Sequence, residues 1–130
     1  MYGVVDEARL WGHYARHKGA CQYPIDEMAA GFARQARKVR SVFPAVELVD
    51  TETSSGITDM AEFGQWLDAL KRELGDGALK VVSFDLQWYR PWQQTVPPMI
   101  EVLKQHGLGY GVNYKGTYLD TTNANDIAAA

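Results

Sequence analysis

The chain has 130 residues, 46% of them hydrophobic and 22% charged, with a formal net charge of −3. This composition fits one compact soluble domain and excludes a disordered chain, a collagen and a membrane-spanning protein. The single cysteine, Cys21, excludes an internal disulfide and a cysteine-rich metal site. The acidic balance argues against a nucleic-acid partner, and the sequence indicates no cofactor and no metal.

The chain opens with a short predicted strand, residues 2–7, which ends in the carboxylates Asp6 and Glu7. We expect an irregular segment over residues 11–23. Loops that follow strands are favoured places for binding groups. The predicted substrate-binding residues in this segment are Trp11, His13 and Tyr14.

Two helices and one strand are predicted next. Apolar residues at three- and four-residue spacing predict a helix that begins after Pro24 and ends before Phe43. A strand over 46–52 follows. Asp59, with an acidic residue three positions later, resembles a capping box and predicts a second helix that stops at Gly75.

The second half continues the same rhythm. A third strand over 80–87 is followed by a mostly helical segment over 91–105. The pair Pro97-Pro98 predicts a kink there, or a fresh helix near that point. A fourth strand is predicted over 108–114.

Alternation along these strands predicts which residues share a face. In the third strand, Val82, Phe84, Leu86 and Trp88 share an apolar face, and Ser83, Asp85 and Gln87 share the other. In the second strand, one face carries Val46, Leu48, Asp50 and Glu52.

Strands separated by single helices predict an α/β fold with parallel strands and right-handed crossovers. One apolar and one polar face favours a partial TIM-barrel-like sheet with helices on one face, because a doubly wound sheet is apolar on both. A small flavodoxin-like α/β domain is the alternative. We expect residues 1–130 to form a single α/β domain of about four βα units, and a closed barrel needs roughly 200 residues or more. The domain is thus expected to be part of a larger barrel, or a half-barrel completed by a homodimer.

The predicted site lies at the C-terminal ends of the strands, where (β/α) barrels carry their active residues. Two carboxylates facing a glycosidic bond can act as an acid and as a nucleophile or base, and aromatic rings pack on sugar faces. The candidate catalytic residues are Asp6, Glu7, Glu52 and Asp85. Beyond the early loop, the candidate substrate-binding residues are Asp50, Gln87, Trp88, Tyr89, Asn113 and Tyr114.

Each candidate also has a structural alternative. Asp50 and Glu52 could form loop hydrogen bonds or caps, and Asp85 could be a buried charge in a hydrogen-bond network. Trp88 could pack in the core, and we expect Trp66 to do so. His13 and His17 have helical spacing in a segment where no helix is predicted, which argues against a metal site.

Several of these short motifs together resemble bacterial glycosidase-like (glycoside hydrolase-like) TIM-barrel proteins, over about half of such a barrel. The motifs that carry the resemblance are Asp6-Glu7, Leu10–Tyr14, Ala20-Cys21, Arg40–Pro44, Val49–Glu52, Phe84–Trp88 and Gly109–Tyr114. The resemblance implies that Glu7 or Asp6 supplies an acid/base, and that Glu52 and Asp85 match later strand-end carboxylates. The fourth strand departs from the pattern, because it ends in Asn113 where many retaining barrels carry a glutamate.

Three functions follow as hypotheses. The first is hydrolysis of a poly- or oligosaccharide by a carboxylate-based site. The second is a non-catalytic carbohydrate-binding module, and the third is a half-barrel whose open face is an oligomer interface. No basic and apolar leader opens the chain, so no signal peptide is predicted, and the localisation of a longer parent protein stays open.

Overall fold

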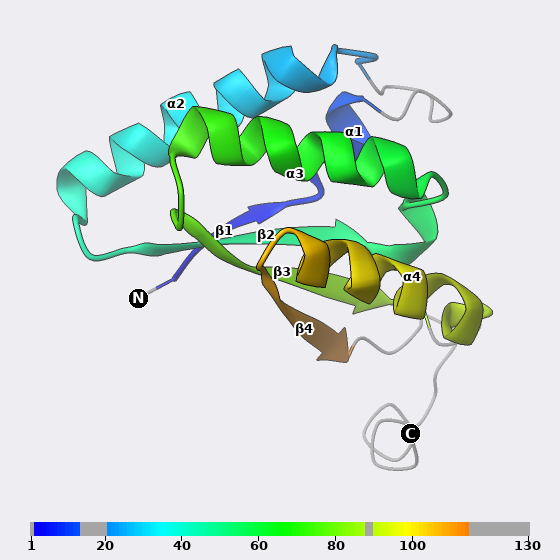
Figure 1. Cartoon of the computed structure of the whole chain (residues 1–130). Helices are drawn as coiled ribbons and strands as arrows, with labels where there is room; N and C mark the ends of the chain where they lie inside the picture. Colours follow the sequence, from blue (N-terminus) through cyan, green and yellow to red (C-terminus); the bar gives the residue numbers. More distant parts are fainter. Residues whose placement is uncertain (1, 14–20, 88–89, 115–130) are drawn as a thin grey trace, which may run out of the picture.

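Four parallel strands form one open sheet (Figure 1). The structure, a computed structural model, describes residues 2–13, 21–87 and 90–114, without the side chains of residues 4–6, 11 and 114. The strands lie in the order β1-β2-β3-β4, and all three neighbouring pairs are parallel. Their bounds are Tyr2–Asp6 for β1, Glu47–Thr53 for β2, Leu79–Leu86 for β3 and Gly109–Tyr114 for β4. The predicted α/β fold with parallel strands is confirmed.

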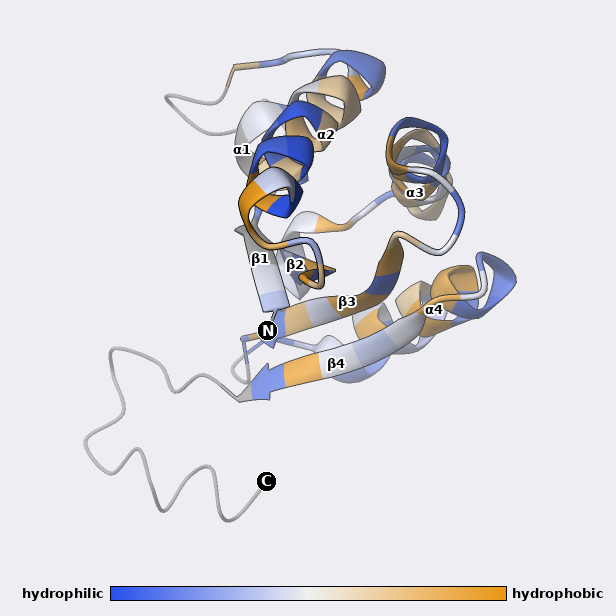
Figure 2. Ribbon diagram, turned by 90° about the vertical axis from the view of Figure 1, so that its left-hand side faces the viewer, coloured by the Kyte–Doolittle hydropathy of each residue, from blue (hydrophilic) through white to orange (hydrophobic). Residues whose placement is uncertain are grey.

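The three long helices lie on the same side of this sheet (Figure 2). They are α2 (Ile25–Val42), α3 (Met60–Leu74) and α4 (Trp92–Gln105). Sequential strand order with one long helix in each crossover produces this arrangement, because right-handed crossovers all return over the same face. Among the helices that the structure describes, none is long and apolar enough to cross a membrane.

Two short helices were not predicted. A one-turn helix, α1 (Ala8–Gly12), follows β1, and a 3₁₀ turn, η1 (Ser54–Gly56), follows β2. The irregular segment predicted from residue 11 begins later than expected, because α1 includes Trp11 and Gly12. Five residues are too few for hydrophobic periodicity to reveal a helix.

Helix ends follow the predicted signals more closely. The side chain of Asp59 accepts hydrogen bonds from the N–H groups of Ala61 and Glu62, at 2.8 and 3.1 Å, which confirms the N-cap of α3. Gly75 ends α3 with φ of 92°, in the left-handed region that glycine adopts easily. The alternative of a fresh helix near Pro97-Pro98 is wrong, because α4 spans both prolines. They are the sixth and seventh residues of α4, beyond the N–H groups that lack a partner at its start, so each proline removes one N–H donor from the helix.

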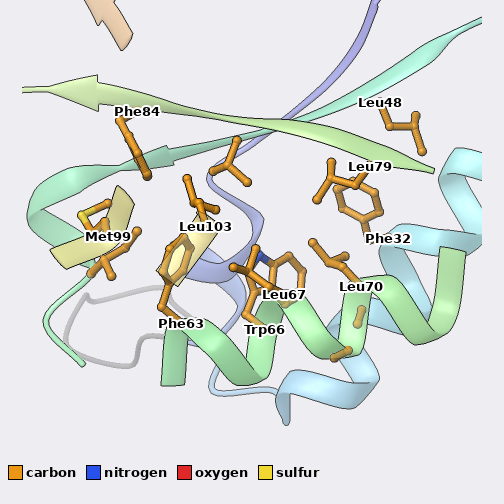
Figure 3. Packing of buried hydrophobic residues seen from close by; sticks show 14 of the residues in the cluster. Phe32, Leu48, Phe63, Trp66, Leu67, Leu70, Leu79, Phe84, Met99 and Leu103 are labelled. Carbon is orange, nitrogen blue, oxygen red and sulfur yellow. The ribbon is translucent and has the colours of Figure 1, made fainter. Parts of the chain in front are cut away.

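The hydrophobic core fills the space between the sheet and the helices (Figure 3). Trp66 of α3 is fully buried, as predicted, and meets Phe32 of α2 edge to face with ring centroids 6.3 Å apart. Phe63 of α3 packs near Phe84 of β3, with centroids 6.5 Å apart. The side of the sheet that contributes to this core is called the helix face below.

The opposite side is called the polar face. As predicted, Val82, Phe84 and Leu86 lie on the helix face, where all three are buried in the core. Their neighbours in β3, Ser83 and Asp85, therefore point to the polar face. The described chain places no helix over the polar face (Figure 2).

Candidate functional site

Polar side chains form a row across the polar face where the strands end. Strand pairing aligns Thr53 of β2 with Asp85 of β3, and Asp85 with Asn113 of β4. Glu7, the residue after β1, joins the row because its Oε1 accepts a hydrogen bond from the Thr53 hydroxyl. These four residues, Glu7, Thr53, Asp85 and Asn113, are called the edge row. The row gathers two predicted catalytic residues and one predicted binding residue from separate βα units.

Asp85 is held by an amide and a hydroxyl of its neighbours. Asn113 donates from Nδ2 to Asp85 Oδ1 at 2.8 Å, and Ser83 donates from Oγ to Asn113 Oδ1 at 3.0 Å. Ser54 donates from Oγ to the carbonyl of Asp85 at 3.2 Å. Asp85 is half-buried and Asn113 is exposed, so the carboxylate is both positioned and within reach of solvent.

Glu7 reaches the edge row through an unusual backbone conformation. Its φ is 51°, in the left-handed region that non-glycine residues rarely adopt. Its N–H still donates to the carbonyl of Thr51 at 2.7 Å, so the residue extends the pairing of β1 with β2. Since the chain turns at Glu7 into α1, the side chain is presented at the end of the sheet.

Asp50 and Glu52 share one face, as predicted, but it is the helix face and not the polar face that carries the edge row. Both are 0% exposed. The indole N–H of Trp66 donates to Asp50 Oδ2 at 2.9 Å, and the N–H of Arg9 donates to Glu52 Oε1 at 3.2 Å. The expectation that this pair reaches an open cleft is therefore not met, because α1 and α3 cover it.

Burial controls the protonation of this pair. Loss of hydration raises the pKa of Asp50 to about 6, against the opposing effects of the Trp66 hydrogen bond and the Arg9 charge. Burial raises the pKa of Glu52 well above its usual value, and the nearby charge of Asp50 adds to the increase. The two carboxyls share one buried cation, so a proton on one of them relieves their repulsion.

His13, the predicted residue of the early loop whose side chain is described, lies apart from the edge row. His13 Nδ1 lies 2.6 Å from the carbonyl of Tyr23, and its Nε2 lies 3.7 Å from Glu62 Oε2. His13 and Glu62 line a cavity of about 690 Å³ beside the N-terminal turns of α2 and α3. This cavity is on the helix side of the sheet, so His13 does not join the carboxylates of the polar face.

Other predicted residues are only partly described. Gln87 follows β3 and is half-buried. Tyr14, Trp88 and Tyr89 lie outside the described residues, as do the side chains of Asp6, Trp11 and Tyr114. The backbone places Asp6 beside Thr51 and Tyr114 beside Leu86. Within the described ranges, no group of three or more His, Cys, Asp or Glu residues is arranged to hold a metal ion.

Sequence reasoning missed three residues of these two clusters. Alternation placed Ser83 on the polar face, although Ser83 was not named as a site residue, and Thr53 could have been placed there in the same way. Arg9 gave no such signal, since its partners Glu52 and Glu62 are 43 and 53 positions away.

Comparison of the chain with protein-family models, curated proteins and solved structures finds no match.

Proposed function

We propose that the sheet is a section of a (β/α) barrel whose polar face is the barrel interior, and that its edge row binds or hydrolyses a carbohydrate. The supporting observation is the edge row itself, which collects two carboxylates, an amide and a hydroxyl from four successive strands at their carboxyl ends. Sequential strand order and helices on one face are what such a barrel requires, whereas the order reverses within a doubly wound sheet.

Glu7 and Asp85 are the carboxylates that we assign to the chemistry. Glu7 directly follows β1 and Asp85 lies in β3, so the strand β2 separates them and their backbones are roughly 10 Å apart. Side chains on such backbones can bring carboxyl groups to the roughly 6.5–9.5 Å that inverting glycosidases use. One carboxyl would then protonate the leaving glycosidic oxygen, while the other takes a proton from the water that attacks the anomeric carbon.

The remaining predicted residues take supporting places in this proposal. Asn113 and Thr53 offer an amide and a hydroxyl to sugar hydroxyls. The aromatic residues predicted to pack on the sugar are Trp11, Tyr14, Trp88, Tyr89 and Tyr114. Asp50 and Glu52, on the helix face, support the end of β2 without contacting the sugar, and Asp6 is the alternative acid to Glu7.

A half-barrel that binds without catalysis, or that pairs with a second copy, is the second candidate. Within the described chain, β1 and β4 each pair with one neighbour, so each leaves one edge of the sheet open. Unpaired parallel edges accept further strands. Two copies would supply the eight strands of a closed barrel, and a longer parent chain could supply the same strands.

Activity of the full chain on a saccharide panel, measured beside two variants, tests the proposal. The panel contains oligosaccharides of glucose, xylose, mannose and N-acetylglucosamine. Asp85→Asn and Glu7→Gln are expected to abolish turnover while the circular dichroism spectrum is unchanged. The matched controls are Asp76→Asn, just before the N-terminal end of β3, and Glu101→Gln on α4; both carboxylates are exposed and neither belongs to the edge row.

The outcomes separate the candidates. Turnover that is lost in Asp85→Asn and Glu7→Gln and retained in the controls supports a hydrolase, and inversion of the product anomer supports the wide carboxylate spacing. Saccharide binding without turnover supports the non-catalytic module. If the folded chain neither binds nor hydrolyses any sugar of the panel, the proposal is contradicted.

A further inference from the structure

Arg9 is the most deeply buried cation among the described residues, with a side chain 1% exposed. Its Nη1 donates to Glu62 Oε1 of α3, and its Nη2 donates to the carbonyl of Gly56 in η1 at 2.6 Å. Its Nε lies 3.7 Å from Glu52 Oε2 of β2. One guanidinium therefore connects α1 to three elements that are more than forty residues away in sequence.

In addition to the ion pairs of Arg9, α1 packs closely against η1 and α2. A Cβ placed at Gly56 would lie 2.7 Å from Leu10 Cδ1, so a larger residue there would require the Leu10 side chain of α1 to move. A Cβ at Gly12 would lie 2.5 Å from Met28 Sδ, which shows the same close approach to α2. Side chains therefore pack directly on the backbone where α1 meets η1 and where it meets α2.

Glu7 is only two positions before Arg9, so the position of α1 bears directly on the conformation of Glu7. The strand β1 ends at Asp6, the backbone of Glu7 is in the left-handed region, and α1 begins at Ala8. Only Ala8 therefore lies between Glu7 and Arg9. A strained conformation of this kind persists only where the surroundings hold it. The guanidinium is the group that fixes the chain immediately after the turn, because its three partners lie on β2, η1 and α3.

We infer that Arg9 is a positioning residue, which holds the β1–α1 turn so that Glu7 is presented to Thr53 on the polar face. The role that this gives Glu7 rests on the proposed function, but the positioning itself is a structural property. The Arg9 contacts described above lie on β2, η1 and α3, so its proposed effect on Glu7 is to hold the turn in place. A lysine at this position would keep the positive charge. It could not reach all three partners at once, because it lacks the planar set of N–H donors of a guanidinium.

Amide hydrogen exchange of the full chain, in wild type and in Arg9→Lys, tests this inference without any ligand. The N–H of Glu7, bonded to the Thr51 carbonyl, is the reporter. We expect its exchange to accelerate by roughly tenfold or more in Arg9→Lys, while amides of β3 and α4 keep their wild-type rates. Arg72→Lys, at an exposed ion pair with Asp26, is the control and should leave Glu7 unchanged.

A purely structural role gives a different pattern. Equal acceleration of Glu7 and of the β3 and α4 amides would mean that Arg9 only stabilises the whole domain, and no acceleration at Glu7 would mean that it does not hold the turn. Either result overturns the inference. If Arg9→Lys does not fold, the neutral double variant Arg9→Gln with Glu52→Gln is measured under the same criterion, because it removes the cation and one buried carboxylate together.

Turnover adds a second readout wherever a saccharide is hydrolysed. Arg9→Lys is expected to lower kcat by roughly tenfold or more with little change in KM, because a displaced acid or base affects the transition state more than ground-state binding. Absence of any saccharide activity contradicts the proposed function and leaves the exchange result to decide the role of Arg9. An unchanged kcat in an active protein contradicts the positioning role.

Discussion

On the helix face of the sheet, Asp50 and Glu52 are fully buried beside Arg9, whereas on the polar face Asp85 is half-buried and bonded to exposed Asn113. The two sets are separated by no more than one strand, and each contains an aspartate. Surroundings therefore decide what a strand-end carboxylate can do. Covered carboxylates change the stability of the fold with pH, whereas the half-buried Asp85 is within reach of solvent.

Removal of the buried cation should have the largest effect on stability. Arg9→Met leaves two buried carboxylates without their cation, and breaking a buried ion pair in this way costs about 3–5 kcal/mol. Urea denaturation at neutral pH measures the loss. A loss below about 1 kcal/mol, the size typical of an exposed ion pair, would contradict the assignment of this cluster to the interior.

The pH dependence of stability sharpens the comparison next. Burial raises the pKa of Asp50 from 3.8 to about 6, so the native state holds this proton more tightly than the unfolded chain does. The resulting stabilisation is complete below the unfolded pKa and is lost as the pH rises through about 6. The loss from Asp50 between about pH 4 and pH 7 is on the order of 3 kcal/mol.

Asp50→Asn isolates this contribution. The variant cannot titrate at position 50, so its free energy of unfolding should increase relative to that of the wild type as the pH rises from about 4 to 7. Parallel urea denaturation series at several pH values measure the difference. A difference that stays constant with pH would mean that folding does not shift the pKa of Asp50, and a change in the opposite direction would mean that folding lowers it.

Trp66→Phe should have an intermediate effect. It removes the N–H that bonds Asp50 Oδ2, and Oδ1 has no hydrogen-bond partner among the described residues. Leaving a buried group unsatisfied costs about 1–3 kcal/mol, and the pKa of Asp50 should rise further because that hydrogen bond lowers it. Thermal unfolding and carboxyl NMR titration measure the two effects. A fall in the Asp50 pKa would contradict this geometry.

Asp85→Asn should have the smallest effect on stability, within about 0.5 kcal/mol. The new side-chain carbonyl can still accept from Asn113 Nδ2, and the site is half-buried. Urea denaturation of this variant beside Asp50→Asn makes the comparison directly. A loss at position 85 as large as at position 50 would mean that the polar face is as structural as the helix face.

The sequence predicted the alternation of each strand but not which layer each face meets. Val82, Phe84 and Leu86 are apolar throughout, so their face could be assigned to the core from the pattern alone. In β2, Leu48 and Asp50 share one face. The pattern could not show whether this face packs in the core, as Leu48 suggests, or is open to solvent, as Asp50 suggests. The answer depends on Trp66 and Arg9, which reach β2 from other elements.

The edge row was partly predictable for a related reason. Glu7, Asp85 and Asn113 were proposed because parallel strands bring their carboxyl ends to one edge. Their contacts depend on register, which pairs Thr53 with Asp85 and Asp85 with Asn113. A shift of one residue would turn each of these side chains to the other face, and no residue in the sequence fixes that register by itself.

The location of saccharide binding tests the central claim most directly. Amide chemical shifts of the full, isotope-labelled chain are recorded while each oligosaccharide of the panel is added. We predict that the shifts change at Glu7, Thr53, Asp85 and Asn113 and stay constant along α2 and α3. Changes confined to the cavity beside His13 and Glu62, or no change with any sugar, would contradict the assignment of the polar face as the binding site.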